Sequence, residues 1–278
     1  SIESEYNIDI YDDLNKSYQR SPDLVIISTP TSLHFDHIIR ASNEGASIIV
    51  EKPGCVNKNQ ASKLSEVLKK NNTKFLVSFQ RRLHPLIVKL KNILINTDDR
   101  EIDNIEINVG SYVPSWHPYE DYKSLYACKK ILGGGVLLTE SHEIDFIIWL
   151  FGLPKTLKSS ISSNKKYNLD VEDSANILLE YKNFHITINL DFMSKESKRC
   201  FQINTKTQSI YLDLESQKLV IDDLNGNTIV EKTNITNDQL FENQLSSFIN
   251  NNNNLRNIDS LVKNLGIIDQ CKEMNGLV

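Results

Sequence analysis

The 278-residue sequence lacks the groups on which several classes of protein depend. Its four cysteines, Cys55, Cys128, Cys200 and Cys271, are scattered without C-x-x-C spacing, which argues against a disulfide framework or a cysteine metal site. P-loop, H-E-x-x-H and Ser-His-Asp patterns are absent as well. No apolar run approaches the roughly 20 residues of a membrane span, and a net charge of −5 gives no basic surface for nucleic acid or anionic lipid. We therefore expect a cytoplasmic protein without a metal site, and with neither nucleic acid nor membrane as a partner.

The first part of the chain alternates between short strand and helix patterns. Three short apolar runs, at 24–28, 47–50 and 74–78, are typical of parallel strands that are buried on both faces, and the first of them is rich in β-branched residues. Helical patterns separate these runs, which predicts a parallel sheet with right-handed crossovers. In such sheets ligands bind beyond the carboxyl ends of the strands. Here those ends are residues 29–31, 51–53 and 80–82.

From residue 86 onward the pattern changes. Short stretches between residues 101 and 231 alternate polar and apolar side chains, as strands with one buried face do. Two helical patterns, at 238–250 and 258–275, follow them. The sequence thus predicts an α/β unit, residues 1–85, and then an α+β unit, residues 86–278, with a large and mostly antiparallel open sheet.

Residues 132–152, LGGGVLLTESHEIDFIIWLFG, are the most informative stretch. Three adjacent glycines permit close approach of the backbone, and a polar island at 139–143 interrupts an apolar helical pattern. A polar island within one buried helix requires a partner or a function. On a helical wheel His142 shares a face with Asp145, whereas Glu140 points nearly the opposite way. His142 is therefore either a general acid/base whose tautomer Asp145 fixes, or a core histidine that Asp145 satisfies.

Glu51-Lys52-Pro53 is a second candidate site, because it stands at the carboxyl end of a predicted buried strand. An amine held there by the following proline can bind a substrate oxygen and help to move its proton. The alternative is a solvated surface lysine, the usual environment of this residue. The turn Thr29-Pro30-Thr31 with His34 suits a flat cofactor ring or a ribose, although a plain strand-to-helix turn fits it equally well.

A segment ahead of the glycines is rich in aromatic side chains, among them Trp116 and Tyr122. Such a loop suits a polyhydroxylated ligand such as a sugar, and an aromatic loop packed over the helix is the alternative. Arg81 could contact a bound molecule or form a surface ion pair. For Arg82 we favour the surface ion pair, and Arg199 could reach an acidic group.

In their order and spacing these motifs resemble the Gfo/Idh/MocA family, the glucose–fructose oxidoreductase and inositol dehydrogenase group of NAD(P)-dependent sugar oxidoreductases. The matching segments lie at 23–30 with His34, at 51–53, at 79–82, and from 133 through His142 to 152. The resemblance implies an incomplete N-terminal Rossmann domain. It also implies a C-terminal α/β domain whose open sheet forms a homo-oligomer, either a dimer or a tetramer.

The resemblance further implies roles for individual residues. Lys52 and His142 would be the acid/base pair on a sugar or nucleotide-sugar hydroxyl, whose carbon exchanges hydride with nicotinamide C4 of NAD or NADP. Asp145 would complete the catalytic set. The expected cofactor-binding residues are Ser28, Thr29, Pro30, Thr31, His34, Glu51, Lys52, Pro53 and Gln80. The expected substrate-binding residues are Arg81, Trp116, Tyr122, Glu140 and His142.

The chain departs from the family pattern in two respects. Many members have aspartate four residues before the histidine, or glutamate three before it, where this chain has Leu138 and Thr139. A proton relay would then use Thr139, Glu140 or Asp145, or be weaker. The sequence also has no G-x-G-x-x-G, the turn that binds the pyrophosphate. We expect that roughly forty upstream residues are absent, as judged from the length of a βαβ unit, because the apolar flanks of the first strand have not become polar.

Three functions compete for this sequence. The first is a sugar or nucleotide-sugar dehydrogenase, and the second is a cofactor-free sugar-binding or scaffolding relative that has lost the dinucleotide site. The third is a lyase or epimerase that uses Lys52 and His142 with transient oxidation. Retention of that pair favours an enzyme, because binding alone does not need it, whereas the absent glycine turn favours the cofactor-free relative.

Overall fold

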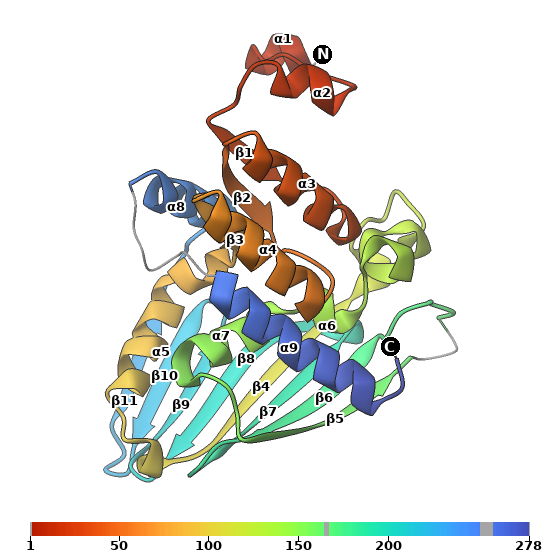
Figure 1. Ribbon diagram of the computed structural model, residues 1–278. Coiled ribbons are helices and arrows are strands. Elements are labelled where there is room, and N and C mark those ends of the chain that lie inside the picture. The colour runs from red at the N-terminus through yellow and green to blue at the C-terminus, as the bar shows by residue number, and fades with distance from the viewer. Residues whose placement is uncertain (1, 164–166, 251–257, 278) are drawn as a thin grey trace.

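The computed structural model describes residues 2–163, 167–250 and 258–277 (Figure 1). Its first sheet has three parallel strands in the order β1-β2-β3, with a crossover helix after each of the first two. The elements are β1 (Leu24–Ile27), α3 (Thr31–Asn43), β2 (Ser47–Glu51), α4 (Lys58–Lys70) and β3 (Phe75–Ser78). They are preceded by α1 (Ile2–Tyr6) and α2 (Leu14–Tyr18). The predicted parallel α/β unit is confirmed.

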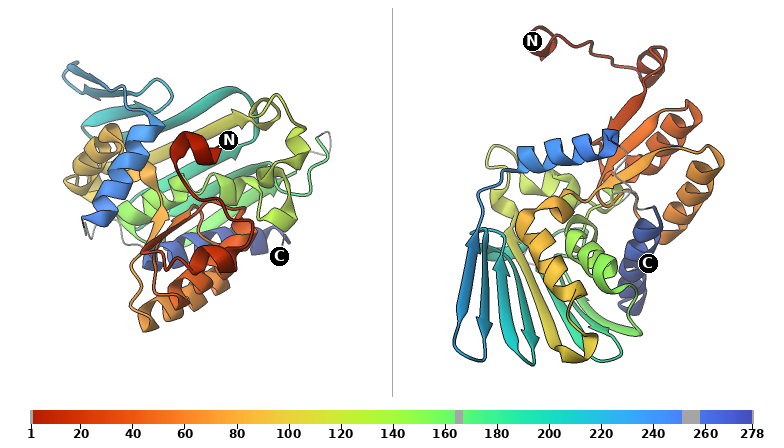
Figure 2. Two further views of the ribbon diagram at one scale, coloured as in Figure 1. Left: turned by 90° about the horizontal axis from the view of Figure 1, so that it is seen from above. Right: turned by 90° about the vertical axis from the view of Figure 1, so that its left-hand side faces the viewer.

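Helices lie on both faces of this first sheet. α3 and α4 cover one face, and α8 (Asn237–Ile249) returns from late in the chain to the other (Figure 2). Phe248 of α8 packs against apolar side chains of β2 and β3. β1 lies at the edge of the sheet, and its Ile26 is 58% exposed. The prediction that the first strand is buried on both faces is therefore wrong, because α8 packs mainly on the other two strands.

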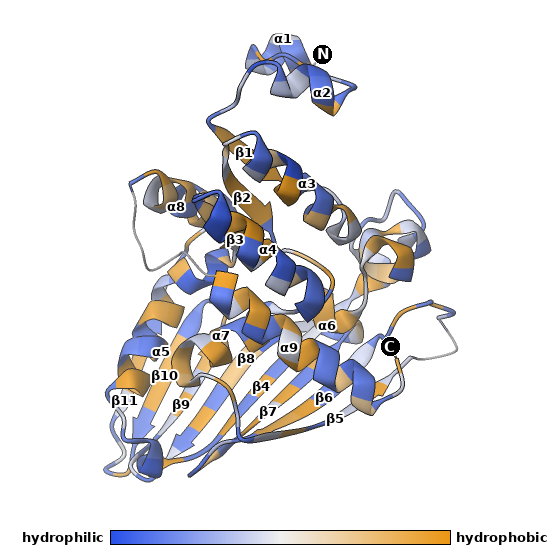
Figure 3. Ribbon diagram, viewed as in Figure 1, coloured by the Kyte–Doolittle hydropathy of each residue, from blue (hydrophilic) through white to orange (hydrophobic). Residues whose placement is uncertain are grey.

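The second sheet has eight strands in the order β11-β10-β9-β8-β4-β7-β6-β5. Neighbouring strands are antiparallel, except that β4 and β7 run parallel. The strands are β4 (Ile102–Tyr112), β5 (Thr156–Ser162), β6 (Ser174–Glu180), β7 (His185–Asp191), β8 (Met193–Thr205), β9 (Gln208–Asp213), β10 (Lys218–Asp223) and β11 (Thr228–Lys232). Hydrophilic and hydrophobic residues alternate along them (Figure 3). The predicted large, mostly antiparallel sheet is confirmed.

Helices of the described chain cover one face of this second sheet and leave the other face open (Figure 2). The covering helices are α5 (Pro85–Ile95), α6 (Val136–Thr139), α7 (His142–Phe151) and α9 (Ile258–Met274). α9 also packs against α4, and Asp269 on α9 accepts a hydrogen bond from the backbone N–H of Lys58 at 2.8 Å. The last helix therefore joins the two sheets.

Short 3₁₀ turns connect the larger elements. They are η1 (Gln80–Leu83), η2 (Asp99–Glu101), η3 (Val113–Ser115), η4 (Tyr122–Ser124), η5 (Tyr126–Cys128) and η6 (Lys130–Leu132). The last four form a lobe between β4 and α6, at the right of Figure 1. Within the described ranges, none of the helices combines the length and apolar character that a membrane crossing requires.

Candidate active site

Lys52 joins the two sheets at the point where β2 ends. Its Nζ donates a hydrogen bond to the backbone carbonyl of Thr139 at 2.5 Å, across 87 positions of sequence. The side chain is partly buried, so the solvated surface lysine of the alternative interpretation is not observed. Burial lowers the pKa of the ammonium, while the nearby carboxylates of Glu140 and Glu51 oppose that shift. The parallel sheet thus presents an amine to the stretch that follows the glycines.

The stretch that follows the three glycines, residues 136–151, is not one helix. α6 ends at Thr139 and α7 begins at His142, with Glu140 closing α6 at φ −100° and ψ 37°. The break redirects the polar side chains, and Glu140 lies near Lys52 and Arg199. The predicted continuous helix, and the predicted direction of Glu140, are wrong because a helical wheel assumes an unbroken helix.

Arg199, on β8, is the centre of a buried group of charges. Its terminal nitrogens donate to Oε2 of Glu140 at 2.6 Å and to Oε1 of Glu143. Each of these three side chains is at most 8% exposed. Burial by itself raises the pKa of Glu140, but Arg199 and Lys52 together outweigh it and lower that pKa. This Arg199 cluster, which we define as Arg199, Glu140 and Glu143, therefore holds an ionised carboxylate close to the Lys52 ammonium.

His142 stands next to the cluster at the start of α7. Its ring lies edge-to-face on Phe79, with 5.7 Å between ring centroids, and the residue is 7% exposed. Burial, with the positive charges of Arg81 and Lys52, lowers the pKa of His142 well below its usual value. Among the described residues none is hydrogen-bonded to the ring. The imidazole is therefore neutral near pH 7 and free to accept a proton.

Asp145 does not pair with His142. Both carboxylate oxygens of Asp145 accept hydrogen bonds from Arg82, at 2.7 Å from Nε and 2.6 Å from Nη2. Ser260 of α9 also donates to Asp145, at 3.3 Å. The predicted pairing of Asp145 with His142 is wrong, because Arg82 already occupies the carboxylate. The predicted surface location of Arg82 is wrong too: the pair is 5% and 1% exposed.

Several buried polar atoms near Lys52 have no hydrogen-bond partner within the described part of the chain. They are Gln80 Oε1, Thr139 Oγ1, Ser141 Oγ, Glu143 Oε2 and Arg199 Nε. Native proteins leave few buried polar atoms unpaired, and those that remain need an explanation. Glu143 Oε2 and Arg199 Nε belong to the Arg199 cluster, and Thr139 Oγ1 and Ser141 Oγ belong to the break between α6 and α7. The described residues include three further atoms of this kind, on His34, Ser111 and Asn264.

The residues predicted to bind a cofactor lie at the carboxyl ends of the three strands of the first sheet. The turn 29–31 follows β1, residues 51–53 end and follow β2, and Gln80 follows β3. Within the turn, Nε2 of His34 donates to the carbonyl of Thr29 at 2.7 Å. Burial lowers the pKa of His34 to about 4. His34 is therefore a neutral ring that stabilises the turn through this hydrogen bond. Of the other predicted cofactor-binding residues, Ser28 is exposed and Pro53 is buried.

In the aromatic lobe, the two predicted substrate-binding residues make contacts within the protein. Trp116 packs edge-to-face on Phe192, with 5.6 Å between centroids, and the Tyr122 hydroxyl donates to the carbonyl of Tyr167 at 3.4 Å. Both contacts fit the interpretation of a packed aromatic loop. Tyr126 belongs to the same aromatic segment, and burial, with the carboxylates of Glu140 and Glu51, raises the pKa of its hydroxyl to about 12.

Two cavities bound this region. One, of about 870 Å³, lies beside Gly133 and Gly134 and is lined on its other sides by Asp170 and Lys272, with neither Lys52 nor His142 in its wall. The other, of about 10 Å³, lies behind His142 and has room for at most a single water molecule. Within the described residues no group of three or more His, Cys, Asp or Glu side chains is arranged to hold a metal ion.

Comparison with known proteins gives matches in both sheet units. Residues 1–79 match the model described as "Oxidoreductase family, NAD-binding Rossmann fold", and residues 101–211 match the one described as "GFO/IDH/MocA C-terminal domain". Oxidoreductase P35 of Formosa agariphila is 29% identical over 53% of this chain and 46% of its own length. The NAD⁺-dependent scyllo-inositol 2-dehydrogenase of Bacillus subtilis is 32% identical over 47% and 35%, respectively. The chain thus spans about half, or less, of the curated relatives it matches.

Solved structures resemble nearly the whole chain. An inositol dehydrogenase homologue from Azotobacter vinelandii, complexed with NAD⁺, superimposes with a TM-score of 0.84 at 17% identity, over 99% of this chain and 84% of that one. UDP-N-acetylglucosamine 3-dehydrogenase from Acidithiobacillus ferrooxidans gives a TM-score of 0.79 at 16% identity, over 98% and 84%. At this level of identity these likenesses establish the fold.

Proposed function

This chain belongs to the Gfo/Idh/MocA family of oxidoreductases with an NAD-binding Rossmann fold, and we propose that it exchanges hydride between nicotinamide and a hydroxyl-bearing carbon of a sugar or nucleotide sugar. The observation that carries the proposal is the contact between Lys52 and Thr139. It holds an amine beside an unpaired neutral histidine and an ionised carboxylate. A protein that only binds sugars has no need of that combination.

Lys52 holds the reacting oxygen in this proposal. An ammonium group has three N–H donors, and the hydrogen bond to Thr139 uses one of them. The remaining donors are available to a substrate hydroxyl, and they stabilise negative charge on its oxygen as the proton leaves. Because burial lowers the pKa of Lys52, the amine can also share that proton.

His142 receives the proton in the direction of alcohol oxidation. The hydroxyl O–H bond breaks, the proton goes to the neutral imidazole, and the carbonyl forms as the C–H bond yields its hydride. Bound nicotinamide supplies the acceptor or donor of that hydride. In the direction of reduction the same residues return the proton to the carbonyl oxygen. His142 and Lys52 are then the acid/base pair.

Glu140 is the carboxylate that serves this pair. Asp145 is bound by Arg82, and Thr139 contributes its backbone carbonyl rather than an acid. Glu140 is held by Arg199 at 2.6 Å and raises the pKa of Lys52. It can therefore keep Lys52 protonated and accept a hydrogen bond from a substrate hydroxyl.

The edge of the first sheet fits a nicotinamide cofactor. Thr29 lies in the turn after β1, with its hydroxyl 3.3 Å from Nδ1 of His37, and Thr31 is the buried first residue of α3. The buried Oε1 of Gln80 lacks a hydrogen-bond donor among the described residues. We propose that these residues, with Glu51, hold the ribose and amide portion of NAD or NADP. A solved relative with this fold is complexed with NAD⁺.

The substrate class follows from the relatives and from the unpaired atoms. Solved and curated relatives are named as dehydrogenases of inositols and of UDP-N-acetylglucosamine, and polyols supply the several hydroxyls that the unpaired buried atoms could bind. We propose that Arg81, Trp116 and Tyr122 form the wall around the ligand. We also propose that the open face of the eight-stranded sheet pairs with a second copy of the chain.

The test is a titration of the purified chain with NADH and NADPH, followed by reduced-nicotinamide fluorescence. It is paired with assays of NAD⁺ and NADP⁺ reduction in the presence of myo-inositol and UDP-N-acetylglucosamine. We expect saturable binding of one coenzyme, and turnover that disappears in His142→Asn while coenzyme binding persists. Failure of both coenzymes to bind would leave two alternatives, an enzyme that needs the absent pyrophosphate-binding turn and a cofactor-free sugar-binding relative. Repeating the titration with the upstream coding sequence restored would decide between them.

A further inference from the structure

One turn of α9 lies against the two chain segments that carry the proposed acid/base pair. Leu261 of α9 packs beside Gly54, two residues after Lys52, where a Cβ on the glycine would lie 3.0 Å from Cδ2 of the leucine. Asn264 follows on the same face of α9, and its Nδ2 donates a hydrogen bond to the backbone carbonyl of Ser141 at 3.1 Å. Both α9 residues are fully buried. A single face of this helix therefore touches the chain just after the lysine and just before the histidine.

The start of α7 lacks the usual cap. Ser141 stands between Glu140, which closes α6, and His142, the first residue of α7. A helix commonly begins at a side chain that accepts a hydrogen bond from the first turn. Among the described residues the Ser141 side chain makes no such bond, and its buried Oγ has no partner. The hydrogen bond from Asn264 is thus a contact from outside α7 that holds the backbone directly before His142.

Asn264 is a polar side chain in an apolar part of α9, where Leu265 and Ile267 are buried. Its Oδ1 has no donor within the described ranges, so the asparagine leaves a buried acceptor unpaired, which an apolar side chain of similar size would not. The Ser141 carbonyl also accepts the backbone N–H of Asp145 at 3.0 Å. That carbonyl would therefore keep a donor without Asn264, and the need to pair it does not by itself explain the asparagine.

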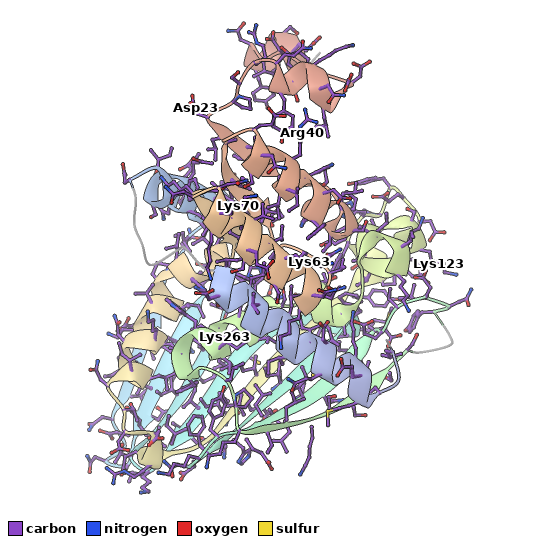
Figure 4. All side chains as sticks on the ribbon, viewed as in Figure 1. Asp23, Arg40, Lys63, Lys70, Lys123 and Lys263 are labelled. Carbon is purple, nitrogen blue, oxygen red and sulfur yellow. The ribbon has the colours of Figure 1, made fainter. Side chains whose placement is uncertain are left out.

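α9 is itself fixed on the side of Lys52. The segment after Lys52 leads into α4, and Asp269 of α9 accepts the backbone N–H of Lys58, the first residue of α4, at 2.8 Å. Lys263, the neighbour of Asn264 in sequence, is exposed on the outside of the molecule (Figure 4). The buried face of α9 can therefore hold the two segments at a fixed separation.

We propose that Asn264 is a positioning residue for the acid/base pair. It anchors the break between α6 and α7 to α9, and α9 thereby sets the place of His142 relative to Lys52. This inference rests on the proposed function. An acid/base group must lie within hydrogen-bond reach of the proton that it transfers, and a displacement of about 1 Å can lower the rate by about 10²-fold. Asn264 acts through the orientation of His142 and not by a contact with substrate.

The experiment compares Asn264→Leu with wild type and with Asn275→Leu. Asn275, just past the end of α9, donates from Nδ2 to Oγ of Ser159 on β5 at 3.0 Å, so its variant removes a hydrogen bond of the same helix elsewhere. In Asn264→Leu we expect kcat for NAD(P)⁺ reduction to fall about 10- to 100-fold, with KM and the coenzyme dissociation constant changed by less than about threefold. Asn275→Leu should keep kcat within about twofold of wild type.

A second readout does not depend on turnover. The ring nitrogens of His142 in ¹⁵N-histidine-labelled protein report the environment of that imidazole, and their NMR signals are identified by their loss in His142→Asn. We expect these signals to shift in Asn264→Leu and to stay in place in Asn275→Leu. The signals of His34, whose Nε2 is bound to the carbonyl of Thr29, should stay unchanged in both variants and serve as the reference.

Unchanged kcat and unchanged His142 signals in a folded Asn264→Leu protein would overturn this inference and leave the proposed function intact. An equal loss of kcat in Asn264→Leu and Asn275→Leu would overturn it as well, since the effect would then be a general one on the fold. Asn264→Ala repeats the comparison if leucine prevents folding. If wild type turns over neither myo-inositol nor UDP-N-acetylglucosamine, the proposed function fails for this chain, and the His142 signals decide by themselves whether Asn264 holds that residue.

Discussion

Two buried arginine groups flank the same helix, α7, and they differ in how completely their polar atoms are paired. Arg82 binds both oxygens of Asp145 and also donates to Ser260 at 2.9 Å. The Arg199 cluster, by contrast, leaves Nε of Arg199 and Oε2 of Glu143 without partners among the described residues. The first group is closed on itself, and the second is open.

The difference teaches which buried charges serve the fold and which serve a ligand. The Arg82–Asp145 pair connects η1 with α7 and, through Ser260, with α9, so it holds three segments of the chain in place. The Arg199 cluster instead lies beside Lys52 and His142, and it keeps a buried donor and a buried acceptor without partners among the described residues. Both groups combine an arginine with carboxylates, and they differ in their pairing. Asp145 is bound through both of its carboxylate oxygens, whereas the Arg199 cluster keeps a donor and an acceptor without partners among the described residues.

The largest effect is expected for Lys52→Met, which changes the amine beside the Arg199 cluster. General acid–base groups contribute about 10²- to 10⁴-fold to rate, so we expect turnover in the NAD(P)⁺-reduction assay to fall by that factor. Thermal unfolding should change little, because the variant removes a buried charge instead of isolating one. Lys63→Met, on the exposed surface of α4 (Figure 4), is the matched control. Equal turnover in both variants would remove Lys52 from the mechanism.

Breaking the Arg82–Asp145 pair should lower the free energy of unfolding. Arg82→Met isolates the buried carboxylate of Asp145, and breaking such a pair costs about 3–5 kcal/mol. Urea unfolding of the variant measures this loss. The double variant Arg82→Met/Asp145→Leu removes both charges and should recover most of it. If Arg82→Met instead left stability intact while it abolished turnover, the assignment of the Arg82 pair to the fold would be wrong.

A substitution in the glycine turn before α6 should lower the free energy of unfolding by a smaller amount. Gly134→Ala places a Cβ about 2.4 Å from the Tyr126 carbonyl, and overpacking of this kind costs about 1–3 kcal/mol. Gly266→Ala on α9 meets its nearest atom at 3.5 Å, so it should be neutral or stabilising by up to about 1 kcal/mol. Urea unfolding of the two variants compares them directly, and equal stabilities would show that the close approach at Gly134 is not required.

The smallest expected effect is on the pH dependence of the unfolding free energy. The pKa of His142 is lowered in the folded protein, so below about pH 6.5 the unfolded chain binds a proton that the folded chain excludes. Stability therefore falls as pH decreases through this range, by roughly 1.4 kcal/mol per pH unit for this residue. His142→Asn should weaken the pH dependence of unfolding by about one proton between pH 6 and pH 5. The same slope in both proteins would mean that His142 is protonated in the fold.

Much of the fold could be predicted because its signals are local. The short apolar runs and crossover helices of the first unit, and the alternation in the second, depend on neighbours in sequence. The exposed edge at Ile26 was not predictable in this way, because the burial of a strand depends on whether another element packs on it. Here α8, from more than two hundred positions later, packs mainly on β2 and β3.

The sequence by itself determined the candidate residues Lys52 and His142, since each stands in a motif whose chemistry is visible from residue types and spacing. Only the tertiary structure decided their partners. Asp145 does not contact His142, because Arg82, distant in sequence, binds its carboxylate. Glu140 lies beside Lys52 and Arg199 because the helix breaks at the polar island. Arg199 reaches Glu140 and Glu143 from β8. Local sequence specifies which groups can react or pair, but the three-dimensional packing of distant segments decides which of them meet.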